Sequence, residues 1–163
     1  GVFMVKVSKT NAMRILDSRK IPYELTTYEV KDGKIDGVSV AEKVGKDPKQ
    51  VYKTLVTQGN SKNIYVFVIP VEAELDLKEG AKAAGEKKIE MIPVKDIQKW
   101  TGYIRGGCSP VGMKKPYPTF IDSTANNLDT LVVSGGKIGV QMELKVKDLQ
   151  EAIGAEIADI VKK

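Results

Sequence analysis

Val51-Tyr52-Lys53-Thr54-Leu55-Val56-Thr57 and Asn63-Ile64-Tyr65-Val66-Phe67-Val68-Ile69 are the two runs of sequence that decide the fold. Both are rich in β-branched and aromatic residues, and a Gly59-Asn60 turn lies between them, which predicts a β-hairpin. The second run is apolar at nearly every position, so both of its faces must be covered. We therefore expect a central strand in a sheet that helices cover.

The rest of the chain supplies further short elements in an irregular order. Helices are predicted at Thr10 to Lys20, Ser39 to Gly45, Leu75 to Ala84, Pro93 to Trp100, Asp148 to Ile153 and Glu156 to Val161. Strands are predicted at Tyr23 to Val30, Ile89 to Met91, Thr119 to Asp122, Thr130 to Ser134 and Gly139 to Leu144. The Ser39-Val40-Ala41-Glu42 spacing is that of a capping box, so Ser39 is expected to begin its helix.

These elements predict one compact α+β domain over residues 1–163, with a mixed, largely antiparallel sheet packed with helices. Residues 1–9 are expected to be an N-terminal extension, with Met4 as the natural start. No apolar run is long enough to span a membrane. Cys108 is the only cysteine, which excludes an intrachain disulfide and favours a reducing compartment, the cytoplasm.

The net charge and the absence of histidine limit the classes of function that are possible. The formal net charge is +5, almost all of it from lysine, which is typical either of a solvated surface or of a protein that binds a phosphate backbone. The chain contains no histidine, which excludes Ser-His-Asp and Cys-His nucleophiles and histidine zinc sites. With no acidic cluster of recognisable spacing, we expect neither a metal nor another cofactor.

Three features could carry chemistry, and each has a structural alternative. The glycine-rich stretch at 105–112 could offer backbone amides to an anion or a carbonyl oxygen, or could be a surface turn. Ser134-Gly135-Gly136-Lys137-Ile138-Gly139 could be a second binding loop or a hairpin turn, and it lacks the P-loop pattern. Lys53 could face a cleft or protect the edge of a sheet.

Three segments together resemble the signature segments of the YbaK/EbsC family in order and spacing. They are Val51 to Leu55, Gly106 to Gly112 and Val133 to Gln141. The likeness runs from about Thr10 to the C-terminus. That family is similar to the editing domain inserted in bacterial prolyl-tRNA synthetases. The resemblance implies the barrel-like fold of that domain and the activity of a trans-acting aminoacyl-tRNA deacylase. In the YbaK branch, that activity removes cysteine mischarged onto tRNA for proline.

The resemblance also implies the site residues. Lys53 corresponds to the functional lysine of the family, here the expected catalytic residue. The expected substrate-binding residues are Tyr28, Thr54, Gly106, Gly107, Cys108, Ser109, Pro110, Ser134, Gly135 and Gln141. Gln141 stands where some members have Asp, so no acidic role is transferred to it, and the difference bears on substrate preference. Without a histidine or a cation beside it, the Cys108 thiol should stay protonated, which favours a small loop side chain over a nucleophile.

The mechanism attributed to the YbaK branch explains how a deacylase works without histidine. The substrate's own cysteine thiol attacks its carbonyl and forms a thiolactone. The protein then has to supply a pocket, amides of the Gly106 to Pro110 loop near the oxyanion, and Lys53 as an anchor for the terminal nucleotide or the carbonyl.

Other functions and substrates remain open. One alternative is a non-catalytic protein of the same fold that binds tRNA or a synthetase, and another is an enzyme that uses the two glycine loops for a small molecule or nucleotide. The amino acid removed could be Cys, Ala, Ser or Thr. The expected partners are the 3′ end of aminoacyl-tRNA and prolyl-tRNA synthetase, with no membrane, and the protein is expected to be a monomer or a weak oligomer.

Overall fold

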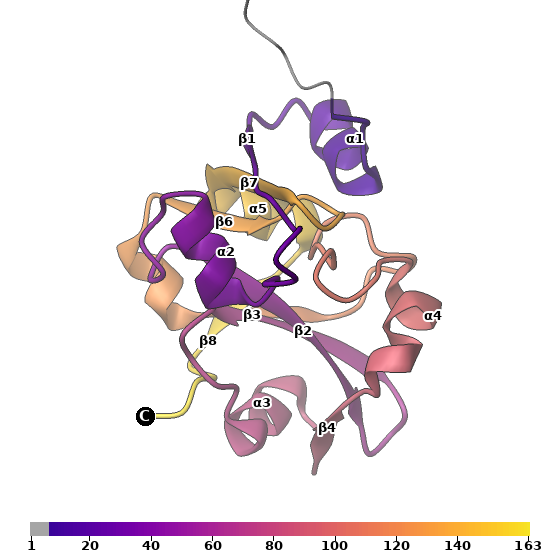
Figure 1. The fold of residues 1–163 in the computed structure, drawn as a ribbon. Coiled ribbons are helices and arrows are strands. Elements are labelled where there is room, and N and C mark those ends of the chain that lie inside the picture. Colours follow the sequence, from indigo (N-terminus) through magenta and orange to yellow (C-terminus); the bar gives the residue numbers. More distant parts are fainter. Residues whose placement is uncertain (1–6) are drawn as a thin grey trace, which may run out of the picture.

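The structure is a computed structural model that describes residues 7–163 (Figure 1). The expected start at Met4 lies outside the described residues. Within residues 7–163 the strands form two sheets, one of five strands in the order β4-β2-β3-β5-β8 and one of three in the order β1-β7-β6. The α+β class with mixed sheets is confirmed.

The predicted hairpin forms the centre of the five-stranded sheet. Strands β2 (Tyr52–Gly59) and β3 (Ile64–Pro70) pair antiparallel, and β4 (Ile89–Met91) pairs with the end of β2. On the other side of β3 lie β5 (Thr119–Asp122) and β8 (Glu156–Ala158), both parallel to their neighbours. Strand β3 is therefore central, as its uninterrupted apolar sequence predicted.

The second sheet consists of β1 (Glu24–Thr27), β7 (Val140–Lys145) and β6 (Thr130–Ser134), which pair antiparallel. An isolated parallel bridge between Val51 and Val132 joins this sheet to the start of β2. The two sheets therefore meet along β2 and β6, next to the second glycine-rich turn.

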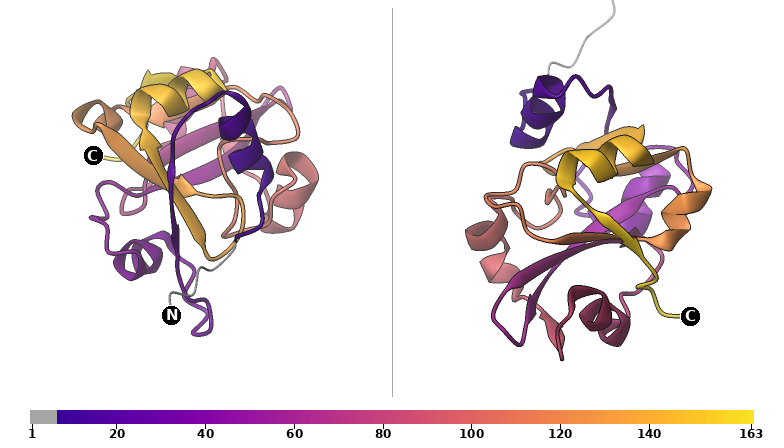
Figure 2. Two further views of the ribbon diagram at one scale, coloured as in Figure 1. Left: turned by 90° about the horizontal axis from the view of Figure 1, so that it is seen from above. Right: turned by 180° about the vertical axis from the view of Figure 1, so that it is seen from behind.

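Both faces of the five-stranded sheet are buried. The largest apolar cluster joins side chains of both sheets with helices α1 (Asn11–Ser18) and α5 (Val146–Ile153). A second cluster, which includes Phe67 and Ile69 of β3, packs beneath helix α3 (Leu77–Ala84). Figure 2 shows α5 against the sheets on the side opposite to α3. The expectation that helices cover the central strand on two sides is confirmed.

Two predictions about helices were wrong. Helix α2 (Gly37–Lys43) begins at Asp36, whose carboxylate accepts a hydrogen bond from the Ser39 amide at 3.1 Å, so Ser39 is not the cap. The predicted helix at Glu156 to Val161 is instead strand β8 and the segment after it. Helix α5 ends at Gly154, which has a positive φ, and the chain then pairs with the open edge of β5.

The predicted helix from Pro93 to Trp100 consists of two short pieces, a 3₁₀ turn η1 (Val94–Asp96) and helix α4 (Ile97–Thr101). A second 3₁₀ turn, η2 (Ser123–Asn127), follows β5. Between α4 and β5 the chain forms no helix or strand, and this segment contains the first glycine loop. No helix within residues 7–163 is long and apolar enough to cross a membrane.

Candidate functional site

A small cavity of about 120 Å³ lies beside the start of β2. Here β2 is flanked by β3 on one side, while β4 pairs only with its far end. The cavity is lined by Tyr28, Ile35, Gly37, Val40, Val51, Tyr52, Lys53, Thr54, Val71, Gly106, Cys108, Ser134 and Gln141. Residues from several separate parts of the chain thus meet at the gap between the two sheets.

Seven of the eleven residues predicted for the site line this cavity. They are Tyr28, Lys53, Thr54, Gly106, Cys108, Ser134 and Gln141. The other four, Gly107, Ser109, Pro110 and Gly135, lie in the same two loops but not on the cavity wall. Their main chain connects to that of the residues on the cavity wall.

Lys53 is the cationic residue of the cavity wall. It lies in the β2–β3 ladder opposite Ile69, and its side chain is half-buried. Burial lowers the pKa of Lys53 below the usual value of a lysine, and the carboxylate of Glu74 acts in the opposite direction. No carboxylate within residues 7–163 is close enough to form a salt bridge with Lys53. Its ammonium is therefore available to an anionic or polarised group in the cavity.

Two hydroxyl groups of the cavity lack a partner. The Tyr28 Oη and Thr54 Oγ1 atoms are buried, and neither has a hydrogen-bond partner within the described part of the chain. A buried hydroxyl without a partner costs free energy, so such a group is unusual unless something else binds it. Both hydroxyls lie where a polar ligand could satisfy them.

Close backbone packing shapes the first glycine loop. Gly106 has a φ of +84°, which favours glycine. A Cβ atom on Gly107 would lie 2.8 Å from Lys137 Cα and 2.9 Å from the Ile138 nitrogen, both of which are backbone atoms. The two glycine-rich turns therefore touch each other through their main chains, and only glycine fits at Gly107.

The amides of the first glycine loop are not equivalent. The Gly107 amide donates a hydrogen bond to the Ile104 carbonyl at 3.0 Å, so it is already occupied. No acceptor among residues 7–163 bonds the amides of Gly106 or Cys108. Two backbone donors that are open to a ligand are thus on residues that line the cavity.

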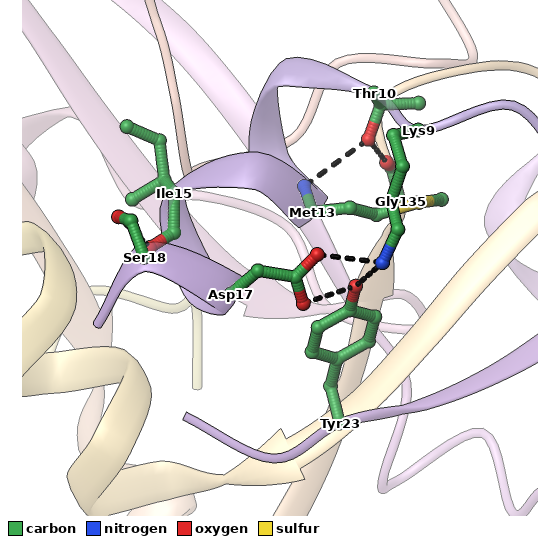
Figure 3. Close-up of polar contacts among 8 residues, drawn as sticks. All are labelled: Lys9, Thr10, Met13, Ile15, Asp17, Ser18, Tyr23 and Gly135. Atoms are coloured by element: carbon green, nitrogen blue, oxygen red, sulfur yellow. Dashed lines mark hydrogen bonds and ion pairs between the residues drawn. The ribbon is translucent and has the colours of Figure 1, made fainter. Parts of the chain in front are cut away.

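The second glycine-rich turn is held by helix α1, as Figure 3 shows. The Thr10 hydroxyl donates to the Gly135 carbonyl at 2.6 Å and accepts from the Met13 amide at 3.2 Å, so one side chain both caps α1 and fixes the turn. Next to it, the Ser134 hydroxyl accepts from the Gly136 amide at 3.2 Å. This leaves the Ser134 proton free to be donated to a ligand.

Burial makes the Cys108 thiol a weaker acid than an exposed thiol. Burial raises the pKa of its thiol to about 11, against the opposing effect of a weak hydrogen bond from the thiol to Thr101 Oγ1 at 3.9 Å. A thiol with so high a pKa stays protonated near neutral pH. The prediction that Cys108 contributes a small side chain and not a nucleophile agrees with this environment.

Ser109 and Pro110 are buried at the far end of the first glycine loop. The Ser109 hydroxyl accepts from the Val111 amide at 3.2 Å, and the Tyr103 hydroxyl donates to the Val111 carbonyl at 2.6 Å. These bonds fix the far end of the glycine loop. Gln141 is 6% exposed and lies opposite Thr26 in the β1–β7 ladder.

Sequence reasoning missed the wall that helix α2 and the loop before it contribute. Ile35, Gly37 and Val40 line the cavity, but their residue types are those of ordinary core or turn positions. The loop between β1 and α2 is held by Lys43, whose Nζ donates to the carbonyls of Glu29 at 2.7 Å and Lys34 at 3.0 Å. The same Nζ bonds the Asp32 carboxylate at 2.7 Å and lies 6.0 Å from the centre of the Tyr28 ring.

The sequence that forms this site matches a known protein family. Residues 36–152 match the model of the Aminoacyl-tRNA editing domain. The chain is a member of this family. The part that matches the editing domain model includes Lys53, both glycine-rich turns and Gln141, and begins after Tyr28. The predicted relationship to the YbaK/EbsC proteins is confirmed.

This editing domain is also similar to individual proteins of known name or structure. A protein of Enterococcus faecalis, provisionally named Cys-tRNA(Pro)/Cys-tRNA(Cys) deacylase EbsC, is 44% identical over 95% of this chain and 94% of its own length. The proline–tRNA ligase of Burkholderia mallei is 26% identical over 97% of this chain, which spans only 28% of that ligase. A crystal structure provisionally described as a trans-editing enzyme for prolyl tRNA synthetase superposes with a TM-score of 0.83 at 22% identity, covering 94% of this chain and 96% of the other.

Proposed function

We propose that this editing domain is a trans-acting aminoacyl-tRNA deacylase that removes cysteine from tRNA for proline. The observation that carries the proposal is the cavity itself. It combines an unpaired lysine, two unpartnered hydroxyls and two free backbone amides in a space of about 120 Å³. A cavity of this size suits a small aminoacyl side chain. The match to the editing domain family and the name of the 44% identical relative support the same activity.

In this proposal the substrate supplies its own nucleophile. The thiol sulfur of the cysteinyl group attacks its ester carbonyl carbon, the carbon–oxygen bond to the terminal ribose breaks, and the thiol proton ends on the released ribose hydroxyl. The products are a cysteine thiolactone and free tRNA. The pocket's contribution is to fold the side chain back over the carbonyl, an effect that can be worth on the order of 7 kcal/mol or more.

Protein groups would stabilise the charge that develops during this attack. The amides of Gly106 and Cys108 are the donors proposed for the oxyanion, and a single such donor contributes about 3 kcal/mol. The Lys53 ammonium would hold the carbonyl or the terminal nucleotide. The hydroxyls of Tyr28 and Thr54 would bind the polar groups of the aminoacyl ester.

A deacylation panel tests the proposal. The purified protein is incubated with tRNA for proline charged with Cys, Ala, Ser or Thr, and release of the amino acid is measured. We expect Cys to be released fastest and Lys53→Ala to lower kcat/KM on the order of a hundredfold or more. Lys78→Ala, which removes an exposed lysine of α3, serves as the control of equal charge and should behave as wild type.

Two outcomes would contradict the proposal in different ways. Release of Ala as fast as Cys would refute attack by the substrate thiol while leaving deacylation in place. Tight binding of Cys-tRNA without turnover would instead support a tRNA-binding protein of the same fold. We further propose that the protein acts in the cytoplasm as a monomer or weak oligomer, with prolyl-tRNA synthetase as a partner that helps select the tRNA.

A further inference from the structure

A group of cationic side chains lies next to the glycine loop. Residues 95–115 contain five Lys or Arg and a single acidic residue, Asp96, a net charge of +4. The five cationic side chains are all exposed, and we call them the α4 surface: Lys95, Lys99, Arg105, Lys114 and Lys115.

A hydrogen bond joins two of these cationic residues, Lys99 and Lys114. The Lys114 Nζ donates to the Lys99 carbonyl at 3.2 Å, at the C-terminal end of α4. The Lys99 Nζ lies 5.0 Å from the centre of the Trp100 ring. No carboxylate among residues 7–163 forms a salt bridge with any of the five. Clustered like charges without counterions raise the free energy of the free protein, and a bound polyanion relieves that repulsion.

The α4 surface also adjoins the cavity. Trp100 and Cys108 pack in one apolar cluster, so α4 lies directly against the loop whose residues Gly106 and Cys108 line the cavity. Arg105 immediately precedes Gly106. A molecule whose end enters the cavity can therefore extend onto α4.

We propose that the α4 surface binds the sugar–phosphate backbone of RNA next to its aminoacylated 3′ end. The inference rests on the proposed function and adds the location of the RNA outside the cavity. Lysine and arginine side chains bind backbone phosphates without reading sequence.

The test compares a long and a short substrate. Lys95→Gln/Lys99→Gln removes two charges from α4 outside the cavity, and Lys145→Gln/Lys147→Gln removes two exposed charges at the start of α5 as the matched control. Each protein is assayed on full-length Cys-tRNA(Pro) and on a cysteinyl CCA trinucleotide, which lacks the acceptor stem. Binding of uncharged tRNA is measured as a function of salt.

For the α4 variant we expect KM on full-length tRNA to rise on the order of tenfold, while activity on the trinucleotide stays unchanged. The slope of log affinity against log salt should decrease by about 0.7 to 0.9 for each phosphate that the variant no longer binds. The control should match wild type on both substrates. Lys95→Arg/Lys99→Arg should restore binding, because phosphate binding requires charge.

Unchanged tRNA binding in the α4 variant would overturn the inference, as would equal losses on both substrates. A loss seen only when prolyl-tRNA synthetase is added would also overturn it and would assign the surface to that protein, for which the exposed Val94 and Ile104 offer apolar contacts. If wild type cleaves neither substrate, the proposed function fails, whereas the tRNA-binding measurement still decides the role of the α4 surface.

Discussion

Burial acts on two residues of the cavity wall so that both are pushed toward their neutral forms. It lowers the pKa of Lys53 and raises that of Cys108 to about 11. For Lys53 this means that the ammonium releases its proton more easily than an exposed lysine does. For Cys108 it means that the thiolate is scarce. In the proposed mechanism the cation of the site is therefore one that is neutralised more easily than an exposed lysine, and the Cys108 thiol is not the nucleophile.

The lowered pKa of Lys53 predicts how activity depends on pH. If the ammonium form is required, activity is complete below the pKa of Lys53 and is lost as the pH rises through it, at a value below the ~10.4 of an ordinary lysine. Lys53→Arg should move this alkaline loss to higher pH, because arginine stays protonated throughout. The measurement is kcat/KM against pH after subtraction of spontaneous ester hydrolysis. An alkaline limb that does not move would show that another group titrates.

Replacement of Cys108 tests whether the loop thiol takes part in the chemistry. Cys108→Ala should keep kcat within about threefold of wild type, because a thiol with a pKa of about 11 is almost fully protonated at neutral pH. Wild-type protein should also react slowly with iodoacetamide compared with a free thiol. Complete loss of deacylation in a variant that still folds would contradict this role and would require the thiol in the reaction.

At the scale of elements, the loop between β1 and α2 depends on Lys43. Lys43→Met removes the three hydrogen bonds that hold this loop, which carries Tyr28 and Ile35 to the cavity. We expect KM for Cys-tRNA to rise on the order of tenfold with a smaller change in kcat, because the pocket loses its preorganised wall. Hydrogen exchange at residues 29–35 should become faster.

The control for Lys43 is Lys46→Met, which breaks the ion pair with Glu143 at 2.8 Å and leaves the loop untouched. Lys43→Arg should recover part of the affinity, because arginine can donate to the same acceptors. If exchange in the loop is unchanged, or if Lys46→Met has the same effect on KM, Lys43 does not position the cavity wall.

The elements that sequence reasoning predicted are those whose pattern is local. The β2–β3 hairpin and helix α3 follow from their own residues, including the cap Asp76 and the terminal Gly85. Strand β8 has three residues and exists because β5 offers an edge to pair with, which no local pattern reveals. At α2, Asp36 and Ser39 are both good caps, and the structure uses the first.

Part of the cavity wall was predicted from the sequence. Lys53 and the glycine-rich turns could be recognised as candidates because together they resemble the signature segments of the YbaK/EbsC family. Ile35, Val40 and Val71 could not, because an apolar residue that faces a cavity has the same sequence signal as one in the core. The side chains that set the size of the pocket are thus the least visible in the sequence.

For the whole molecule, the C-terminal segment closes the five-stranded sheet. Strand β8 covers the edge of β5, and the Asp122 carboxylate accepts from the Ile160 amide at 3.0 Å. Ending the chain after Gly154 should lower the free energy of unfolding by roughly 3 kcal/mol or more, because Ile157 and the fully buried Ile160 are lost from the core.

Removing β8 should also cause self-association, since an apolar edge strand becomes open to pairing. Urea denaturation and size-exclusion chromatography measure the two effects. A chain that ends after Val161 keeps β8 and should remain close to wild type in both. Equal stability of the two truncated chains would show that β8 does not support the sheet.

The contact between the two glycine-rich turns has a consequence for how this molecule can change. Because Gly107 touches the main chain of Lys137 and Ile138, neither turn can shift without displacing the other, and together they form a fixed half of the cavity. Other parts of the wall consist of side chains that can be exchanged, among them Val40 and Ile35, whose Cδ1 packs against Gly106. Adaptation to a different amino acid, in nature or by design, is therefore expected to proceed through residues 28–40 while the turns stay constant.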